Sequence, residues 1–198
     1  MIYLVLAIIA IGLAIGVRVL EWKVWWKKFD ANPRNFPFHH KGRVLWHSRS
    51  VAVAAFTFCK NSLGEWCVLA NQRGKGAADY NYYWNVACGF LDFSETAQHA
   101  AKRETLEETS IDLSDDMFQF HSVQSDPKKS NQQNVTIRYF VKIEDKTTDD
   151  FKFGELKGGE KNEVNDIRWI PISTLKEYNW AFGHKGTIEK IVDEKIVK

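Results

Sequence analysis

The sequence predicts an α/β domain that follows a single membrane-spanning helix. Residues 1–17 carry no charge and are mostly Ile, Leu, Ala and Val. Farther along, residues 95–109 form a run without Gly or Pro that favours a helix. Apolar stretches typical of β-strands lie on both sides of this run, and a helical pattern ends the chain. At 198 residues, the chain has room for one domain of ordinary size and an appendage.

Residues 1–22 are interpreted as a transmembrane anchor. Through Leu20 the apolar run is interrupted only by Arg18, whose side chain can snorkel, and about 17 to 20 residues just span a bilayer core. Residues 22–28 combine tryptophans with lysines, as membrane interfaces do. Because positive charge lies only on this side, the positive-inside rule places Met1 outside and the domain in the cytoplasm. The alternatives are a buried core helix and a cleaved signal peptide, which is disfavoured because no basic residue precedes the run.

Residues 23–42 are predicted to be a juxtamembrane linker without regular structure, and the domain is predicted over residues 43–198. The linker contains Asn32-Pro33 and Phe36-Pro37, dipeptides that are typical of turns and loops. The adjacent pair His39-His40 is interpreted as a polar spacer.

Five strands are predicted from apolar, β-branched or alternating stretches. They cover residues 51–59, 66–70, 118–123, 135–143 and 167–170. A turn at residues 61–64 joins the first two, and Pro171 ends the last. A C-terminal helix is predicted from apolar residues at helical spacing, which are Ile188, Ile191, Val192 and Ile196.

The loop after the second strand contains Arg73 and a cluster of aromatic residues. Arg73 is a candidate phosphate ligand, and an aromatic ring here is a candidate for stacking on a base or ribose. The alternative is that Trp84 faces the core while Tyr80, Tyr82 and Tyr83 are exposed to solvent. We favour the core position for Trp84 and the substrate site for Arg73.

The helix over residues 95–109 is predicted to have Ser94 as its N-cap and Glu95 in its first turn, where the helix dipole favours an acid. Alanines at positions 97, 100 and 101 share one face of this helix. Three glutamates continue the same stripe, and they are Glu104, Glu107 and Glu108.

Such a stripe of carboxylates is costly, because like charges three and four residues apart repel and because unpaired charge beside a buried face is expensive. A divalent cation removes both penalties, and Mg²⁺ prefers carboxylate oxygens, waters and substrate phosphates. The helix therefore predicts a Mg²⁺ site. The alternative is a solvated acidic face.

The spacing from Gly89 to Ile111 resembles the Nudix box, the signature of Nudix hydrolases. It reads Gly, five residues, Glu, seven residues, Arg-Glu, two residues, Glu-Glu, two residues and an apolar residue. Thr105 stands where an aliphatic residue is usual, Ser110 replaces the usual Gly after the helix, and residues 87–88 replace a Pro-Gly pair. None of these departures removes a metal ligand.

The resemblance implies an α/β/α sandwich with a mixed sheet, from about residue 43 to the C-terminus. It also implies hydrolysis of a diphosphate that links a nucleoside to a second group. By resemblance, Mg²⁺ or Mn²⁺ is held by Glu104, Glu107 and Glu108. Glu95 and Arg103 are expected to pair as structural support, and Gly89 to let the backbone approach the substrate.

Many Nudix enzymes use a further glutamate, from the loop before the last strand, as a base or ligand. Glu163 lies six residues before Trp169 and looks like that position, with Glu160 as the second candidate. Pro127 is placed like a proline that is frequent in members that cleave ADP-ribose. An ADP-ribose-like or dinucleotide substrate is therefore favoured.

Two other functions stay open: a membrane-tethered nucleotide sensor with this fold, and a hydrolase of a lipid-linked diphosphate. The complete acid set favours an enzyme, whereas the anchor keeps both alternatives open. The net charge of +2 argues neither for nor against nucleic acid, and no nucleic-acid partner is expected. Gly12 and Gly16 have the spacing of a helix-packing motif, through which two anchors would form a homodimer.

The cysteines are expected to be reduced thiols of a cytosolic domain. Cys59, Cys67 and Cys88 are widely spaced and form no C-x-x-C pair. Their number and spacing therefore favour neither a zinc site nor a disulfide framework.

Overall fold

The computed structural model describes residues 36–126, 134–154, 156 and 160–197. The predicted anchor, most of the predicted linker and Pro127 lie outside the described residues. Within these ranges, no helix is both long and apolar enough to cross a membrane. The chain divides after Arg49 into two compact units, and each is described by itself.

The described part of the first unit is a β-hairpin, where the sequence predicted a linker without regular structure. Strand β1 (Phe36–His40) pairs antiparallel with β2 (Arg43–His47) through a two-residue turn. The turn residues Lys41 and Gly42 have φ angles of 47° and 73°. Two consecutive positive φ angles match the twist of a tight hairpin, and the glycine adopts its angle at no steric cost. The prediction was wrong because Phe36-Pro37 was interpreted as a loop signal.

The second unit contains a seven-stranded mixed sheet. Its strands are β3 (Val51–Lys60), β4 (Trp66–Arg73), β5 (Trp84–Asn85), β6 (Ala87–Phe90), β7 (Gln119–Gln124), β8 (Val135–Thr147) and β9 (Val164–Pro171). Strands β3 and β8 are parallel, and the other pairs are antiparallel. Each strand predicted from the sequence in this unit is present.

Strands β3 and β4 diverge along their length and leave a gap between them. They pair only where they leave their connecting turn, from Phe58 to Lys60 on β3. The earlier part of β3, Ala52 to Ala55, pairs instead with β6. On the other side of the gap, β5 pairs with the last part of β4. Residues 84–90 therefore fill the space between two strands that separate.

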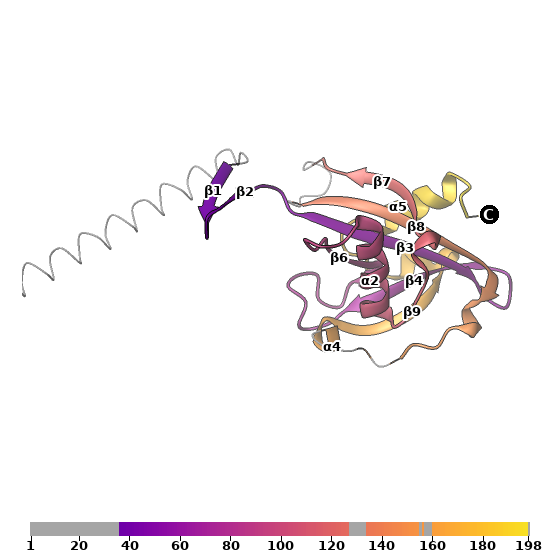
Figure 1. The fold of residues 1–198 in the computed structure, drawn as a ribbon. Coiled ribbons are helices and arrows are strands. Elements are labelled where there is room, and N and C mark those ends of the chain that lie inside the picture. The colour runs from indigo at the N-terminus through magenta and orange to yellow at the C-terminus, as the bar shows by residue number, and fades with distance from the viewer. Residues whose placement is uncertain (1–35, 127–133, 155, 157–159, 198) are drawn as a thin grey trace, which may run out of the picture. The chain divides into compact units, whose positions relative to one another are not determined.

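The helices are α2 (Ala97–Thr109), the single turn α4 (Glu160–Glu163) and α5 (His184–Asp193). Short 3₁₀ segments cover Asp115–Met117, Thr148–Asp150 and Ile172–Glu177. Figure 1 shows α2 lying across one face of the sheet. The buried clusters separate accordingly, because alternate residues of β3 point to opposite faces. The fold is thus an α/β/α arrangement with a mixed sheet.

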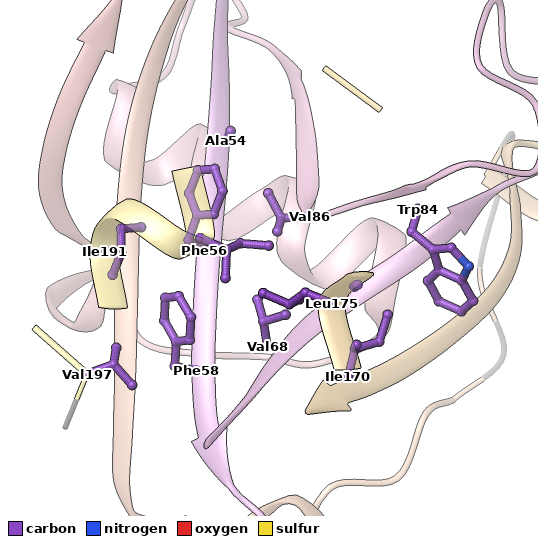
Figure 2. Packing of buried hydrophobic residues seen from close by; sticks show 12 residues of the cluster. Ala54, Phe56, Phe58, Val68, Trp84, Val86, Ile170, Leu175, Ile191 and Val197 are labelled. Carbon is purple, nitrogen blue, oxygen red and sulfur yellow. The ribbon is translucent and has the colours of Figure 1, made fainter. Parts of the chain in front are cut away.

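One cluster packs α5 on the sheet. Phe56 and Phe58 of β3 lie there with Val68 of β4 and Ile191 of α5 (Figure 2). Ile188 of α5 belongs to the same cluster. The other cluster packs α2 on the opposite face, through residues that include Val53, Leu69, Ala100, Ala101 and Val141. Of the apolar residues on which the C-terminal helix was predicted, Ile188 and Ile191 are buried on α5, Val192 is partly buried, and Ile196 lies beyond the end of the helix.

The acidic helix begins later than the sequence predicted. Thr96, not Ser94, is the N-cap, and its hydroxyl accepts the backbone N–H of His99 at 3.1 Å. Glu95 precedes the helix and accepts the N–H of Asp92 at 2.9 Å. At the other end, Ser110 adopts a φ angle of 61°, and its N–H donates to Leu106 O at 2.8 Å. Serine thus ends the helix in the left-handed conformation that usually favours glycine.

His184, at the start of α5, makes the stability of the fold dependent on pH. Its side chain is buried, and Nδ1 accepts the N–H of Val86 at 3.2 Å. Burial lowers the pKa of His184 to about 3. Because an unfolded imidazole has a pKa of about 6.5, only the unfolded chain binds this proton between those values.

We expect the free energy of unfolding to be fully retained above about pH 6.5 and to fall at lower pH, by up to about 1.4 kcal/mol per pH unit until about pH 3. Urea unfolding of the wild type and of His184→Gln at pH 7 and pH 5 measures this term. The variant should lose less stability between the two pH values. An equal loss in both proteins would contradict the assignment.

Candidate active site

The site is organised around the guanidinium of Arg103, which lies on α2. Nε and Nη2 of Arg103 donate to the two oxygens of Glu95, at 3.0 and 2.7 Å. Nη2 also donates to the carbonyl of Phe90 at 3.0 Å. The bidentate bond to Arg103 is the main reason that the pKa of Glu95 falls to about 2. This pair ties the segment before α2 to the helix, as the sequence predicted for Glu95 and Arg103.

The same guanidinium also binds two of the three stripe glutamates. Nη1 of Arg103 donates to Glu104 Oε1 at 2.7 Å and to Glu107 Oε2 at 2.9 Å. Glu104 is nevertheless buried, and burial raises its pKa to about 7 despite the opposing charge of Arg103. One cation therefore does not fully compensate this cluster of acids.

Gly89 makes room for the Glu104 carboxylate. A Cβ atom built at Gly89 would overlap all three atoms of that carboxylate group. Residue 89 lies on β6, opposite Val53 of β3, so the strand lies directly below the helix. The structure therefore gives a steric reason for glycine here. The predicted contact of Gly89 with a substrate stays a prediction.

Glu108 has different partners. Its Oε2 accepts Asn71 Nδ2 at 2.6 Å and the backbone N–H of Cys88 at 3.1 Å. Burial, and then the charge of Glu104, raise the pKa of Glu108 to about 8. Asn71 is buried near the end of β4 and was missed from the sequence, because the predicted strand stopped at Ala70. A polar residue that continues an apolar strand is the signal that points to it.

Arg73 and Glu163 lie on neighbouring segments. Arg73 ends β4, two residues after Asn71, and its Nη2 pairs with Asp79 Oδ1 at 2.9 Å. Glu163 ends α4, and its carbonyl accepts the N–H of Gly74 at 2.6 Å. The two predicted site residues are thus brought close in the backbone. The side chain of Glu160 lies outside the described residues.

The donor set suits a hard divalent cation, although the described residues show no preformed group of three His, Cys, Asp or Glu side chains around a metal position. Glu104, Glu107 and Glu108 offer carboxylate oxygens from one helix face. Burial raises the pKa values of both Glu104 and Glu108, and the charge of Glu104 adds to the rise at Glu108. The Glu104 carboxylate occupies the space that a side chain at position 89 would fill.

The structure also tests which aromatic residues near the site are buried and which are exposed. Trp84 is buried, as favoured from the sequence, and its ring meets Tyr178 edge to face. Tyr80, Tyr82 and Tyr83 are exposed. The three cysteines are free thiols.

Comparisons with known proteins agree with this geometry. A sequence model of the NUDIX domain matches residues 48–191. No curated protein matches the chain. The NUDIX domain of NrtR from Shewanella oneidensis, crystallised with ADP ribose, is 18% identical with a TM-score of 0.62, covering 86% of this chain and 98% of that one.

Two further solved structures are similar. One is a bifunctional NMN adenylyltransferase/ADP ribose pyrophosphatase from Francisella tularensis, complexed with AMP and a Mn ion. It is 20% identical with a TM-score of 0.61, and the match covers 90% of this chain and 47% of that one. The other is an Ap4A hydrolase from C. elegans, 14% identical with a TM-score of 0.52, covering 74% of this chain and 98% of that one.

Identities this low show a shared fold, and the assignment to a family rests on the sequence model. That model spans most of the chain and includes the whole segment from Gly89 to Ile111. The chain therefore belongs to the NUDIX domain family.

Proposed function

We propose that this protein hydrolyses a diphosphate bond in a nucleoside diphosphate that is linked to another group, in a reaction that depends on Mg²⁺ or Mn²⁺. The observation that carries the proposal is the partly compensated acid cluster on α2. Glu104 and Glu108 have raised pKa values in a site that already contains Arg103. Buried carboxylates whose pKa values are raised in this way are typical of functional sites.

The residues on the acidic face of α2 would hold the metal, and they are Glu104, Glu107 and Glu108. A bound Mg²⁺ or Mn²⁺ supplies neutralisation of the diphosphate charge and orients the phosphate that reacts. Arg103 and Glu95 would hold the segment after Gly89 in place. Asn71 and the Cys88 N–H would orient the Glu108 carboxylate.

Glu163 is the proposed general base. In this role its carboxylate takes a proton from the attacking water as the water oxygen bonds to phosphorus. The bond from that phosphorus to the bridging oxygen then breaks, and the leaving phosphate keeps the electron pair. Glu163 suits this role because its side chain is exposed and its carbonyl is bonded to the loop after Arg73.

An ADP-ribose-like or dinucleotide substrate is favoured. Two of the similar structures contain ADP ribose and AMP, and the second belongs to a protein with ADP ribose pyrophosphatase in its name. These similarities support the substrate class by analogy of fold.

A nucleotide sensor is the second candidate. It is favoured by the similarity to NrtR, whose NUDIX domain binds ADP ribose and which has also been crystallised with a 27mer DNA. A sensor would bind nucleotide at the same site without turnover. A lipid-linked diphosphate substrate is the third candidate, and it follows from the proposed anchor.

The proposed catalytic residues can be tested with isosteric variants of the full chain. With Mg²⁺ or Mn²⁺ and a panel of ADP-ribose, dinucleotides, nucleotide sugars and nucleoside triphosphates, we expect cleavage of one class. Glu107→Gln and Glu108→Gln should each lower kcat/KM by about 100-fold or more, because several kcal/mol of charge stabilisation are lost. Product masses and initial rates give the measurement.

Glu189→Gln is the matched control, because Glu189 is exposed on α5 and pairs with Lys185 at 3.6 Å. It should retain wild-type rates. Wild-type rates in both α2 variants would contradict the metal-site assignment. Nucleotide binding without any turnover would favour the sensor.

Metal binding should become tighter as pH rises towards about 8. Burial raises the pKa of Glu108 to about 8, so below that value the group must lose a proton before it can hold a cation. Titration of Mn²⁺ by calorimetry at pH 6.5 and pH 8.5 should show the weaker binding at pH 6.5, with proton release there. Glu108→Gln should reduce the difference. Equal affinity and no proton release in the wild type would count against Glu108 as a ligand.

We further propose that residues 1–22 anchor the protein in a membrane, with the NUDIX domain in the cytoplasm. The proposal is supported by the uncharged run and by the tryptophans and lysines that follow it. In cell fractions, the full chain should sediment with membranes and resist extraction with alkaline carbonate. A variant without residues 1–22 should stay in the supernatant, and sedimentation of both or neither would contradict the anchor.

A further inference from the structure

Three aromatic rings gather beside Arg73, and the proposed reaction does not use them. Tyr80 meets Tyr83 edge to face with ring centroids 5.6 Å apart, and it meets Phe182 in the same way at 5.0 Å. Tyr80 is 44% and Tyr83 is 40% exposed, so both present ring surface to solvent. We call Tyr80, Tyr83 and Phe182 the aromatic platform.

The backbone of this region is held in an unfavourable conformation. Tyr80, Tyr82 and Phe182 have φ angles of 49°, 66° and 55°. Among the described residues, the other positive angles outside glycine belong to a tight turn and to helix ends, at Lys41, Ser110 and Lys195. Left-handed backbone at bulky aromatic residues has an energetic cost and persists only where surrounding contacts impose it.

Those contacts are present. The N–H of Tyr82 donates to Arg73 O at 2.7 Å, and Gln72 Nε2 donates to Tyr82 O at 3.0 Å. Asn81 Nδ2 donates to the carbonyls of Gly74 and Ala77, at 2.8 and 2.9 Å. The backbone of the loop is therefore fixed by its own hydrogen bonds before any ligand arrives.

Arg73 connects the platform to the acid cluster. Its guanidinium lies over the Phe182 ring, 4.9 Å from the centroid, and bonds both the carbonyl and the carboxylate of Asp79. Arg73 also lies two residues along β4 from Asn71, which holds Glu108. Residues i and i+2 of a strand are about 7 Å apart along it, so Arg73 lies close to the residue that holds Glu108.

The other side of the loop is fixed to the segment of the proposed base. Gly74 and Gly76 donate to the carbonyls of Glu163 and Asn162, at 2.6 and 2.7 Å. A Cβ atom at either glycine would overlap the backbone of Asn162. The loop that follows Arg73 and carries Tyr80 and Tyr83 is thus bonded at its start to the segment that ends at Glu163.

We propose that the platform is the subsite for the base of the nucleotide substrate, which packs against the exposed rings of Tyr80 and Tyr83, stacking on one and meeting the other at an angle. Flat π surfaces stack on any nucleobase, and the Phe182 ring packs against the Tyr80 ring. The inference rests on the proposed function, because it assigns the nucleoside end of that substrate to this loop. Its diphosphate end then extends towards Glu108.

Measuring the binding of ligands that cannot be hydrolysed tests the base subsite separately from catalysis. AMP has a base and no diphosphate bond, and ribose 5-phosphate lacks the base, so neither is a substrate for the proposed reaction. With the full chain and Mg²⁺, calorimetry should show AMP bound about tenfold more tightly than ribose 5-phosphate, or better. The paired variant Tyr80→Asn/Tyr83→Leu should lose most of this preference, and asparagine tolerates the positive φ angle at position 80.

Two control variants accompany the paired variant Tyr80→Asn/Tyr83→Leu. Tyr80→Phe keeps the ring and should keep the preference. Phe120→Ala removes a ring that is 60% exposed on β7 and should also keep it. Where ADP-ribose is hydrolysed, the paired variant should raise KM with little change in kcat, because the rings contact the base and not the reacting phosphorus. If the pair does not fold, Tyr83→Leu alone should still weaken AMP selectively.

Three results would overturn the inference: equal wild-type affinity for the two ligands, no saturable AMP binding, or an unchanged preference in the folded variants. Loss of self-association with an unchanged preference would assign the rings to a contact between subunits instead. Hydrolysis of the substrate panel is measured separately. Failure of the proposed base subsite can therefore be distinguished from failure of the proposed hydrolase activity.

Discussion

The guanidinium of Arg103 is the contact on which the rest of the site depends. It bonds Glu95 and the Phe90 carbonyl on one side, and Glu104 and Glu107 on the other. The first two contacts fix the segment that enters α2, and the last two hold carboxylates that would otherwise repel one another. Because hydrogen bonds between charged groups are short and directional, one side chain sets both the loop and the orientation of the acids.

Glu108 has no contact with this guanidinium among those that the structure describes, and its partners come from the sheet. Strands β3 and β4 diverge, so β6 enters the gap and brings the Cys88 N–H and Gly89 below the helix. Asn71, on β4, completes the support of Glu108. Neither an amide nor an N–H group neutralises a buried carboxylate, and this is the physical reason that the acid cluster has unused capacity for a cation.

The elements whose signals are local were predicted well. Five of the seven strands of the mixed sheet, and the buried residues Ile188 and Ile191 of α5, follow from apolar spacing, which a single segment displays by itself. The short strands β5 and β6 were not predicted. The start of α2 was misplaced, because the bond from Arg103 holds Glu95 outside the helix and leaves Thr96 to cap it. The β1–β2 hairpin was missed because its turn depends on the conformations of Lys41 and Gly42, whereas Phe36-Pro37 suggested a loop.

The sequence by itself determined the family-type spacing of the acids, because the period of a helix places Glu104, Glu107 and Glu108 on one face wherever that helix lies. Only the tertiary structure decided what each acid contacts. Glu108 meets Asn71, a residue 37 positions away, and the loop after Arg73 meets the segment that ends at Glu163. Periodicity reports which side of an element is buried, but partners that are distant in sequence are chosen by the way the sheet separates and the helix packs on it.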